Sequence, residues 1–157
     1  MKDLSIMVDD VKFNYRVGLI IKREDEVLVE YNPDYDFVVF PGGRVKALES
    51  SPEALKREIG EEMQIDISND DVKMKGLVEN FFELDEKTYH ELYFLYKIVV
   101  KKDDPRFNDE MINHDSEHSY YKWVKYDKLD EVNLLPVAMR NLSEDDEFQH
   151  LIVNDLK

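Results

Sequence analysis

The chain has 157 residues, and 36 Asp and Glu against 21 Lys and Arg give it a formal net charge of −15. This length suits one domain with a sizeable core, so we expect residues 1–157 to form a single domain. The acidic excess disfavours binding to a nucleic-acid polymer, because such binding depends on Lys and Arg neutralising phosphates. A small phosphate ester that arrives with a divalent cation remains compatible with this charge.

The chain contains no cysteine, which excludes disulfides, thiolate catalysis and cysteine-based metal sites. The first residues lack the apolar core of a signal peptide. No later run approaches the roughly 20 apolar residues that a membrane-spanning helix needs. We therefore expect a cytoplasmic protein without a membrane partner.

The first half of the chain predicts a β-hairpin, a short strand and a helix. Residues 13–22 and 27–31 are rich in β-branched and aromatic residues and flank a short polar turn, which is typical of a hairpin. Residues 36–40 are predicted to form a short buried strand that ends at a Pro-Gly-Gly sequence. From about Ser51 the apolar residues recur with helical spacing.

The second half of the chain continues with strands and ends with a further helix. The predicted segments are strands at 72–82 and 89–100, a polar stretch at 101–118, a strand at 120–125, a helix at 136–141, and a last strand or a docking tail at 148–153. This order predicts an α/β (α+β) fold with helices packed on a mixed sheet.

Gly42 and Gly43 are adjacent between a predicted strand and a predicted helix. Glycine permits positive φ and close backbone approach, so a turn here could present main-chain groups to a ligand. The alternative is an ordinary strand-to-helix turn.

The helix after this turn carries three glutamates on one flank. Ser50 and Pro52 are typical of a helix start. At 100° per residue, Glu58, Glu61 and Glu62 fall within an arc of about 100°, beside the apolar stripe. Each pair of like charges at this spacing destabilises a helix by roughly 0.2–0.5 kcal/mol. A bound Mg²⁺ or Mn²⁺ would remove this repulsion, because the carboxylates would then coordinate the cation. A solvated acidic face is the competing interpretation.

Residues 43–65 read GRVKALESSPEALKREIGEEMQI, which resembles the signature of the Nudix hydrolases. That signature is Gly, five residues, Glu, seven residues, then Arg-Glu-apolar-any-Glu-Glu-any-Gly-apolar. The chain departs from it only at Gln64, where the family usually has Gly. The matching positions are Gly43, Glu49, Arg57, Glu58, Ile59, Glu61, Glu62 and Ile65.

The resemblance implies a Nudix-type α/β/α sandwich and hydrolysis of a nucleoside diphosphate linked to another moiety, with Mg²⁺ or Mn²⁺ as cofactor. It implies that Glu58, Glu61 and Glu62 bind the metal, with the Gly42 carbonyl as an extra ligand. Glu58, Glu61 and Arg57 are accordingly expected to take part in catalysis. Members of the family often form homodimers, so a homodimer is an expected option.

Three further residues take supporting or binding roles by the same resemblance. Glu49 and Arg57 match the pair that ties the loop to the helix, where Arg57 could hold a carboxylate in a bidentate contact; a plain structural salt bridge is the alternative. Gly43 belongs to the same support. Arg44 lies where the family often places a phosphate-contacting cation, and a surface arginine is the competing interpretation.

Two departures from the family pattern affect backbone geometry. Gln64 replaces a Gly that would cap the helix in the left-handed region, so we expect the chain to leave the helix differently. Residues 46–48, Lys-Ala-Leu, replace a frequent Glu-Pro-Gly, which removes one acid and predicts an altered loop shape.

A further acid from outside the signature often completes such a site as metal ligand or general base. Proton abstraction requires a carboxylate within hydrogen-bond reach of the attacking water. Glu117, in the loop before Trp123, is the favoured candidate, and Asp115 and Glu91 are its rivals.

Other side chains suggest additional roles with competing explanations. His114 and His118 have a spacing that could bind zinc, but surface loop histidines are the favoured interpretation. Members of the group Phe81, Phe82, Tyr89, Tyr93 and Tyr96 could stack a base, although such residues more often fill a sheet core. We assign substrate binding to Phe81 and Phe82.

The markers of three branches of the family are missing. No proline lies between Pro52 and Pro105, where the ADP-ribose branch has one, and the markers of the NADH and dinucleoside-polyphosphate branches are absent too. The expected substrate is therefore a nucleoside triphosphate, with oxidised or noncanonical ones included. The alternatives are an ADP-ribose or nucleotide-sugar pyrophosphatase, a nucleotide-sensing module without activity, and an acidic protein-interaction domain that needs no metal.

Overall fold

The computed structural model describes residues 1–156, which form a ten-stranded sheet, one α-helix and two short 3-10 helices. Within these residues no helix is both long enough and apolar enough to cross a membrane. The elements are β1 (Ser5–Val8), β2 (Val11–Arg23), β3 (Glu26–Tyr31), β4 (Val38–Val39), β5 (Gly42–Arg44), α1 (Ser51–Met63), β6 (Lys73–Leu84), β7 (Lys87–Val100), β8 (Glu110–Ile112), β9 (Tyr120–Lys125), η1 (Tyr126–Lys128), η2 (Val137–Asn141) and β10 (Gln149–Asn154).

Most of the predicted elements are confirmed. β2 and β3 form the predicted hairpin, and α1 begins at Ser51. β6 and β7 lie where two long strands were expected, and β9 coincides with the predicted strand at 120–125. Of the two alternatives for residues 148–153, a last strand or a docking tail, the strand is correct, because β10 pairs in parallel with β6. The predicted helix at 136–141 is the 3-10 helix η2. β1, β5 and β8 were not predicted, because strands of three or four residues show too few positions for an alternating pattern.

The sheet is mixed, as expected, and its main order is β10-β6-β7-β2-β3-β9-β8. β2 runs parallel to β7, whereas β2 and β3 are antiparallel. The β2–β3 ladder contains only two registered pairs, Lys22 with Val27 and Arg23 with Glu26. Beyond these pairs the two strands separate, and β5 pairs with β2 while β4 pairs with β3. The Gly-Gly sequence is therefore part of the sheet at this separation.

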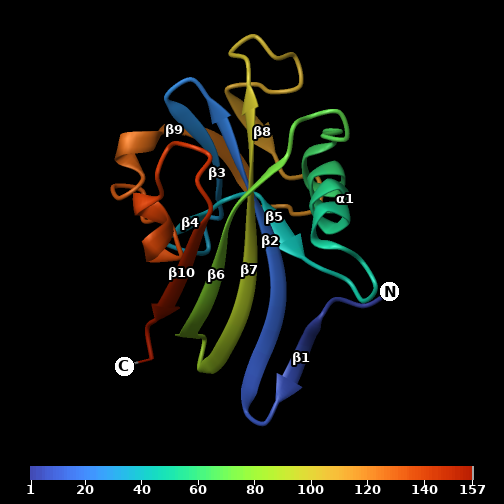
Figure 1. Ribbon diagram of the computed structural model, residues 1–157, viewed down its shortest axis with the longest axis vertical. Coiled ribbons are helices and arrows are strands. Elements are labelled where there is room, and N and C mark those ends of the chain that lie inside the picture. Colours follow the sequence, from blue (N-terminus) through green and yellow to red (C-terminus); the bar gives the residue numbers. More distant parts are fainter. Residues whose placement is uncertain (157) are drawn as a thin grey trace.

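Two cores cover the two faces of the sheet, and α1 forms one of them. Leu55 and Ile59 are completely buried against Val17 and Leu19 of β2, as the helical stripe predicted. Burying one such side chain stabilises the fold by about 1.5–3 kcal/mol. On the other face, η2 and the segment after it contribute Met139 and Leu142. The two helical layers lie on opposite sides of the strands (Figure 1), and the second consists of 3-10 helix rather than α-helix.

Side-chain and backbone caps fix both ends of α1. Ser50 and Glu53 form a capping box, in which each side chain bonds the other residue's backbone N–H. At the other end Gln64 adopts the left-handed conformation, with φ 57° and ψ 38°, and its N–H donates to the Gly60 carbonyl at 3.0 Å. Leu48, which also stands where the family often has Gly, has φ 66°. The expectation that the chain leaves the helix differently is wrong, because Gln64 takes up the conformation typical of Gly there.

Two substitutions test whether the fold imposes strain at these positions. Leu48→Gly and Gln64→Gly should each stabilise the protein by about 0.5–1 kcal/mol, because the left-handed conformation costs a residue with a Cβ more than glycine loses in chain entropy. Urea denaturation measures the change. Ala47→Gly is the matched control in the same loop, and it should destabilise the protein because φ at Ala47 is negative. Destabilisation by both test substitutions would contradict the argument.

Candidate active site

The two glycines of β5 allow neighbouring atoms to approach the backbone closely, and they are not needed for unusual backbone angles. Neither has positive φ. A Cβ on Gly43 would lie 2.3 Å from the carboxyl carbon of Glu58, and one on Gly42 would lie 2.0 Å from the Val17 carbonyl oxygen. The segment is thus a short strand rather than the turn that the sequence suggested. Its missing side chains let the Glu58 carboxylate of α1 pack directly on the backbone.

The hydrogen-bond pattern of this strand leaves two carbonyls facing away from β2. The Pro41 carbonyl accepts a hydrogen bond from β2, and the Val45 N–H donates one back. Because bonding alternates along an antiparallel edge, the carbonyls of Gly42 and Arg44 point the other way. The Arg44 carbonyl accepts from Arg57 Nη2 at 2.9 Å. The Gly42 carbonyl faces the same side, which makes its oxygen available to a ligand.

Arg57 ties the loop, the strand and the helix together. Its Nε and Nη2 donate to the two oxygens of Glu49 at 2.7 and 2.9 Å, which is the bidentate contact that the sequence suggested. Its Nη1 donates to Glu58 at 2.8 Å and, more weakly, to Glu61 at 3.4 Å. The hydrogen bonds from Arg57 lower the pKa of the Glu49 carboxyl. One guanidinium therefore orients three carboxylates.

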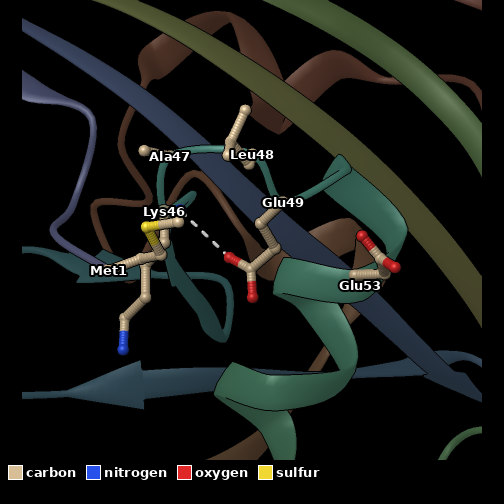
Figure 2. Close-up of a pocket in the computed structure, with 6 residues that line it drawn as sticks. All are labelled: Met1, Lys46, Ala47, Leu48, Glu49 and Glu53. Carbon is tan, nitrogen blue, oxygen red and sulfur yellow. Dashed lines mark hydrogen bonds between the residues drawn. The ribbon is translucent and has the colours of Figure 1, made fainter.

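A shallow recess beside this ion pair shows how the loop is held (Figure 2). Glu49 also accepts from the Lys46 backbone N–H at 3.0 Å, whereas the Lys46 ammonium points away from Glu49. The Leu48 side chain is 92% exposed. The recess is lined by Met1, Lys46, Ala47, Leu48, Glu49 and Glu53. It does not include the glutamates on the flank of the helix, so we do not take it as the site of chemistry.

The helix flank faces a group of half-buried acids. Glu62 accepts a hydrogen bond from the hydroxyl of the fully buried Tyr121 at 3.0 Å. Burial, together with the nearby carboxylates of Glu30 and Glu58, raises the pKa of Glu62 to about 9. Burial also raises the pKa of Glu30. Within residues 1–156 neither Glu30 nor Glu62 forms an ion pair, and a hard cation would supply the missing positive charge.

Glu30 is the site residue that sequence reasoning missed. It lies near the end of β3 and accepts a hydrogen bond from Asn113 Nδ2 at 3.0 Å. In the sequence it looks like a solvent-facing residue at the end of an apolar strand. The signal that could have found it is alternation: Leu28, two residues earlier, belongs to the core under α1, so Glu30 points to the same face.

The loop that carries Glu117 packs on the end of α1. The His114 N–H donates to the Glu62 carbonyl at 2.7 Å. Glu117 and its rival Asp115 are exposed, and within residues 1–156 the Glu117 carboxylate makes no hydrogen bond or ion pair. The other rival, Glu91, is buried on β7 and is held by the Asn14 amide. In the described residues, no hydrogen bond or ion pair joins the Glu117 carboxylate to the glutamates of α1.

Phe81 and Phe82 do not share a surface. Consecutive strand residues point to opposite faces of the sheet, and the two rings accordingly have different partners. Phe81 meets His90 edge-on at 4.6 Å, and Phe82 stacks on Tyr89 at 4.9 Å. The structure thus places the two rings assigned to substrate binding on opposite faces of the sheet, so one base can contact only one of them.

The acidic flank fits a hard divalent cation by the chemistry of its donors. Glu58, Glu61 and Glu62 and the Gly42 carbonyl offer only oxygen atoms, the ligands that Mg²⁺ and Mn²⁺ prefer. Among residues 1–156, no three His, Asp or Glu side chains already form a closed metal-holding group. His114 and His118 are thus not part of such a group in the described residues. Glu61 is 46% exposed and bound to Arg57, so closing a coordination shell requires its side chain to rotate.

Comparisons with known proteins point to one family. Residues 12–145 match the family model described as NUDIX domain. No curated protein sequence matches the chain. A MutT protein from Bacillus halodurans is 22% identical with a TM-score of 0.66, over 92% of this chain and 93% of that one.

Two other solved structures are similar over most of their length. The E. coli dihydroneopterin triphosphate pyrophosphohydrolase is 20% identical with a TM-score of 0.59, over 76% of this chain and 85% of that one. A C. elegans Ap4A hydrolase is 22% identical with a TM-score of 0.54, over 76% of this chain and 86% of that one. At these identities the likeness shows the fold.

The raised pKa of Glu62 predicts how the metal-free protein responds to pH. In the unfolded chain Glu62 loses its proton near its ordinary pKa of 4.5, but the folded protein retains it up to about pH 9. Between these values the folded state binds more protons than the unfolded state, so stability falls as the pH rises. Thermal unfolding in EDTA from pH 5 to 9 measures the slope, which Glu62→Gln should flatten. Glu61→Gln, on the exposed side of the same flank, is the control and should keep the slope; an unchanged slope in Glu62→Gln would contradict the prediction.

Proposed function

The chain belongs to the Nudix family, and on that premise we propose that it is a Mg²⁺- or Mn²⁺-dependent pyrophosphohydrolase acting on a nucleoside triphosphate. The observation that carries the proposal is the packing of the helix-flank carboxylates against the glycine edge of β5. There, Glu58 lies on the Gly43 backbone and the Gly42 carbonyl faces outward. Half-buried acids with raised pKa values at such an edge suit a cation that carries a phosphate.

The residues assigned to the metal are Glu58, Glu61 and Glu62 with the Gly42 carbonyl. When bound, the cation offsets charge on the phosphate oxygens and lowers the pKa of a bound water. Arg57 Nη1 holds Glu58 in place and makes a weaker contact with Glu61, and Glu49 fixes Arg57 in turn. A positioned carboxylate loses little side-chain entropy when it binds its ligand.

Hydrolysis requires a base for the attacking water. The water oxygen forms a bond to one phosphorus, the bridging P–O bond breaks, and the leaving phosphate keeps the electron pair. We assign the released proton to the Glu117 carboxylate, because its loop is bound to the last turn of α1 through the His114 N–H. On the substrate side, we assign Arg44 to a phosphate group and either Phe81 or Phe82 to the base.

The triphosphate is favoured over the alternatives by the missing branch markers. The name of one structural relative, a dihydroneopterin triphosphate pyrophosphohydrolase, also refers to a triphosphate. The Ap4A hydrolase makes dinucleoside polyphosphates a necessary part of any test. ADP-ribose and nucleotide sugars belong to the same test.

A substrate panel with Mg²⁺ tests this function. Nucleoside triphosphates, an oxidised triphosphate, ADP-ribose, a nucleotide sugar and Ap4A are incubated with the protein, and products are identified by mass spectrometry. We expect a triphosphate to yield a nucleoside monophosphate and pyrophosphate. Glu61→Gln and Glu62→Gln should each lower kcat at least about 100-fold, since metal ligation contributes several kcal/mol to such reactions.

Glu53→Gln is the matched control on the same helix. It removes one charge but preserves the capping box, because Gln serves there as well as Glu, so its activity should be normal. A wild-type protein that is inert on the whole panel would refute the enzymatic function. Nucleotide binding without turnover would favour a sensing module.

A further inference from the structure

Two arginines lie directly opposite each other at the edge that carries the glycines. Arg16 of β2 and Arg44 of β5 are paired in the antiparallel register. Directly opposite residues have their Cβ atoms about 4.5–5.5 Å apart on one face of the sheet. Val17, the neighbour of Arg16, belongs to the core under α1, so both arginines project from the other face.

Like charges in this arrangement destabilise a sheet unless something compensates them. Arg44 has only a long contact of 3.9 Å, from Nη1 to Asp3, and its buried Nε has no hydrogen-bond partner within residues 1–156. Over the same residues Arg16 makes no ion pair and no side-chain hydrogen bond. In a chain with 36 acidic residues, two adjacent arginines are thus left without a close acid.

The other arginines each have a close acid or carbonyl partner, although the buried Nε of Arg23, like that of Arg44, has no hydrogen-bond partner within residues 1–156. Arg23 pairs with Glu26 at 3.1 Å, and Arg140 donates to the Leu134 carbonyl at 2.8 Å. Arg57 holds its carboxylates as described above. Among the arginines that the structure describes, only Arg16 and Arg44 therefore lack an acid or carbonyl partner closer than 3.9 Å.

The arginine pair also lies beside the proposed site of chemistry. The Glu58 carboxylate contacts the Gly43 backbone from the α1 side, and Arg44 follows Gly43 and projects to the opposite side. Although burial raises the pKa of Glu30, the charge of Arg16 opposes that rise, so Arg16 lies near the acidic group. A diphosphate bound at this edge would meet carboxylates on one side and guanidinium groups on the other.

We propose that Arg16 is a substrate-positioning residue which, together with Arg44, binds a phosphate group of the substrate's diphosphate at the β2–β5 edge. This inference rests on the proposed function, and it adds a residue that lies outside residues 43–65. Guanidinium forks match phosphate oxygens in bidentate geometry, and two of them would neutralise two charges of the diphosphate. The repulsion between the arginines is then relieved only when substrate is bound.

Arg16→Gln tests the inference, with Lys12→Gln as the matched control. Lys12 is on the same strand and face, about 13 Å from Arg16 at the usual rise per strand residue, and is paired with Met7 rather than with an arginine. With the best triphosphate of the panel, Arg16→Gln should raise KM about 10- to 100-fold with a smaller change in kcat. Lys12→Gln should leave KM within about twofold. Arg16→Lys, which keeps the charge but loses the fork, should lie in between.

Thermal unfolding gives a second readout that does not depend on turnover. In the absence of ligand, Arg16→Gln should leave Tm unchanged or raise it, because the like-charge contact is lost. Pyrophosphate with Mg²⁺ should raise Tm of the wild type and of Lys12→Gln more than that of Arg16→Gln.

The outcomes separate this inference from the function on which it rests. If the wild type turns over and the two variants have equal KM values, the role of Arg16 is refuted while the function stands. A lower Tm of ligand-free Arg16→Gln would show a structural role instead and would also refute the inference. If nothing in the panel is hydrolysed, the proposed function fails, and the pyrophosphate titration alone decides whether Arg16 binds phosphate.

Discussion

The guanidinium of Arg57 is the contact on which the arrangement of the site depends. A guanidinium offers five N–H donors in a rigid plane, and here they bind Glu49, Glu58, Glu61 and the Arg44 carbonyl. These partners come from the loop, the helix and strand β5. Lysine has no planar fork and could not make these contacts together. The sequence spacing from Glu49 to Glu61 therefore has a direct physical reason, since one side chain has to reach all of them.

The rest of the site consists of charges that the fold leaves partly uncompensated. The acids Glu30, Glu58 and Glu62 gather on the α1 side of the glycine edge, and Arg16 and Arg44 gather on the other side. Each group costs stability when no ligand is present, because like charges lie close together in partly buried positions. A cation bound to one group and a phosphate bound to the other would relieve both costs. The proposed chemistry thus accounts for features that stability alone does not explain.

The sequence predicted the parts of the site that are local along the chain. The helix, its cap and the shared flank of Glu58 and Glu62 follow from helical periodicity, and the contact of Arg57 with Glu49 was expected from the resemblance. Glu30 was missed although alternation with Leu28 places it on the α1 face. Arg16 was missed because its pairing with Arg44 arises where β2 and β3 separate, and no pattern in the sequence shows that separation. Phe81 and Phe82 were both assigned to substrate binding, although alternation along a strand places them on opposite faces. The missing glycines at Leu48 and Gln64 also misled the prediction, because the fold imposes positive φ on both.

The central claim is that the carboxylates on the flank of α1 bind a divalent cation. Titration of the protein with Mn²⁺, followed by electron paramagnetic resonance of the free ion, tests this claim without reference to any substrate. We expect saturable binding to the wild type at neutral pH and at least about tenfold weaker binding to Glu58→Gln, a loss of about 1.4 kcal/mol. Equal binding by both proteins, or no binding by the wild type, would contradict it.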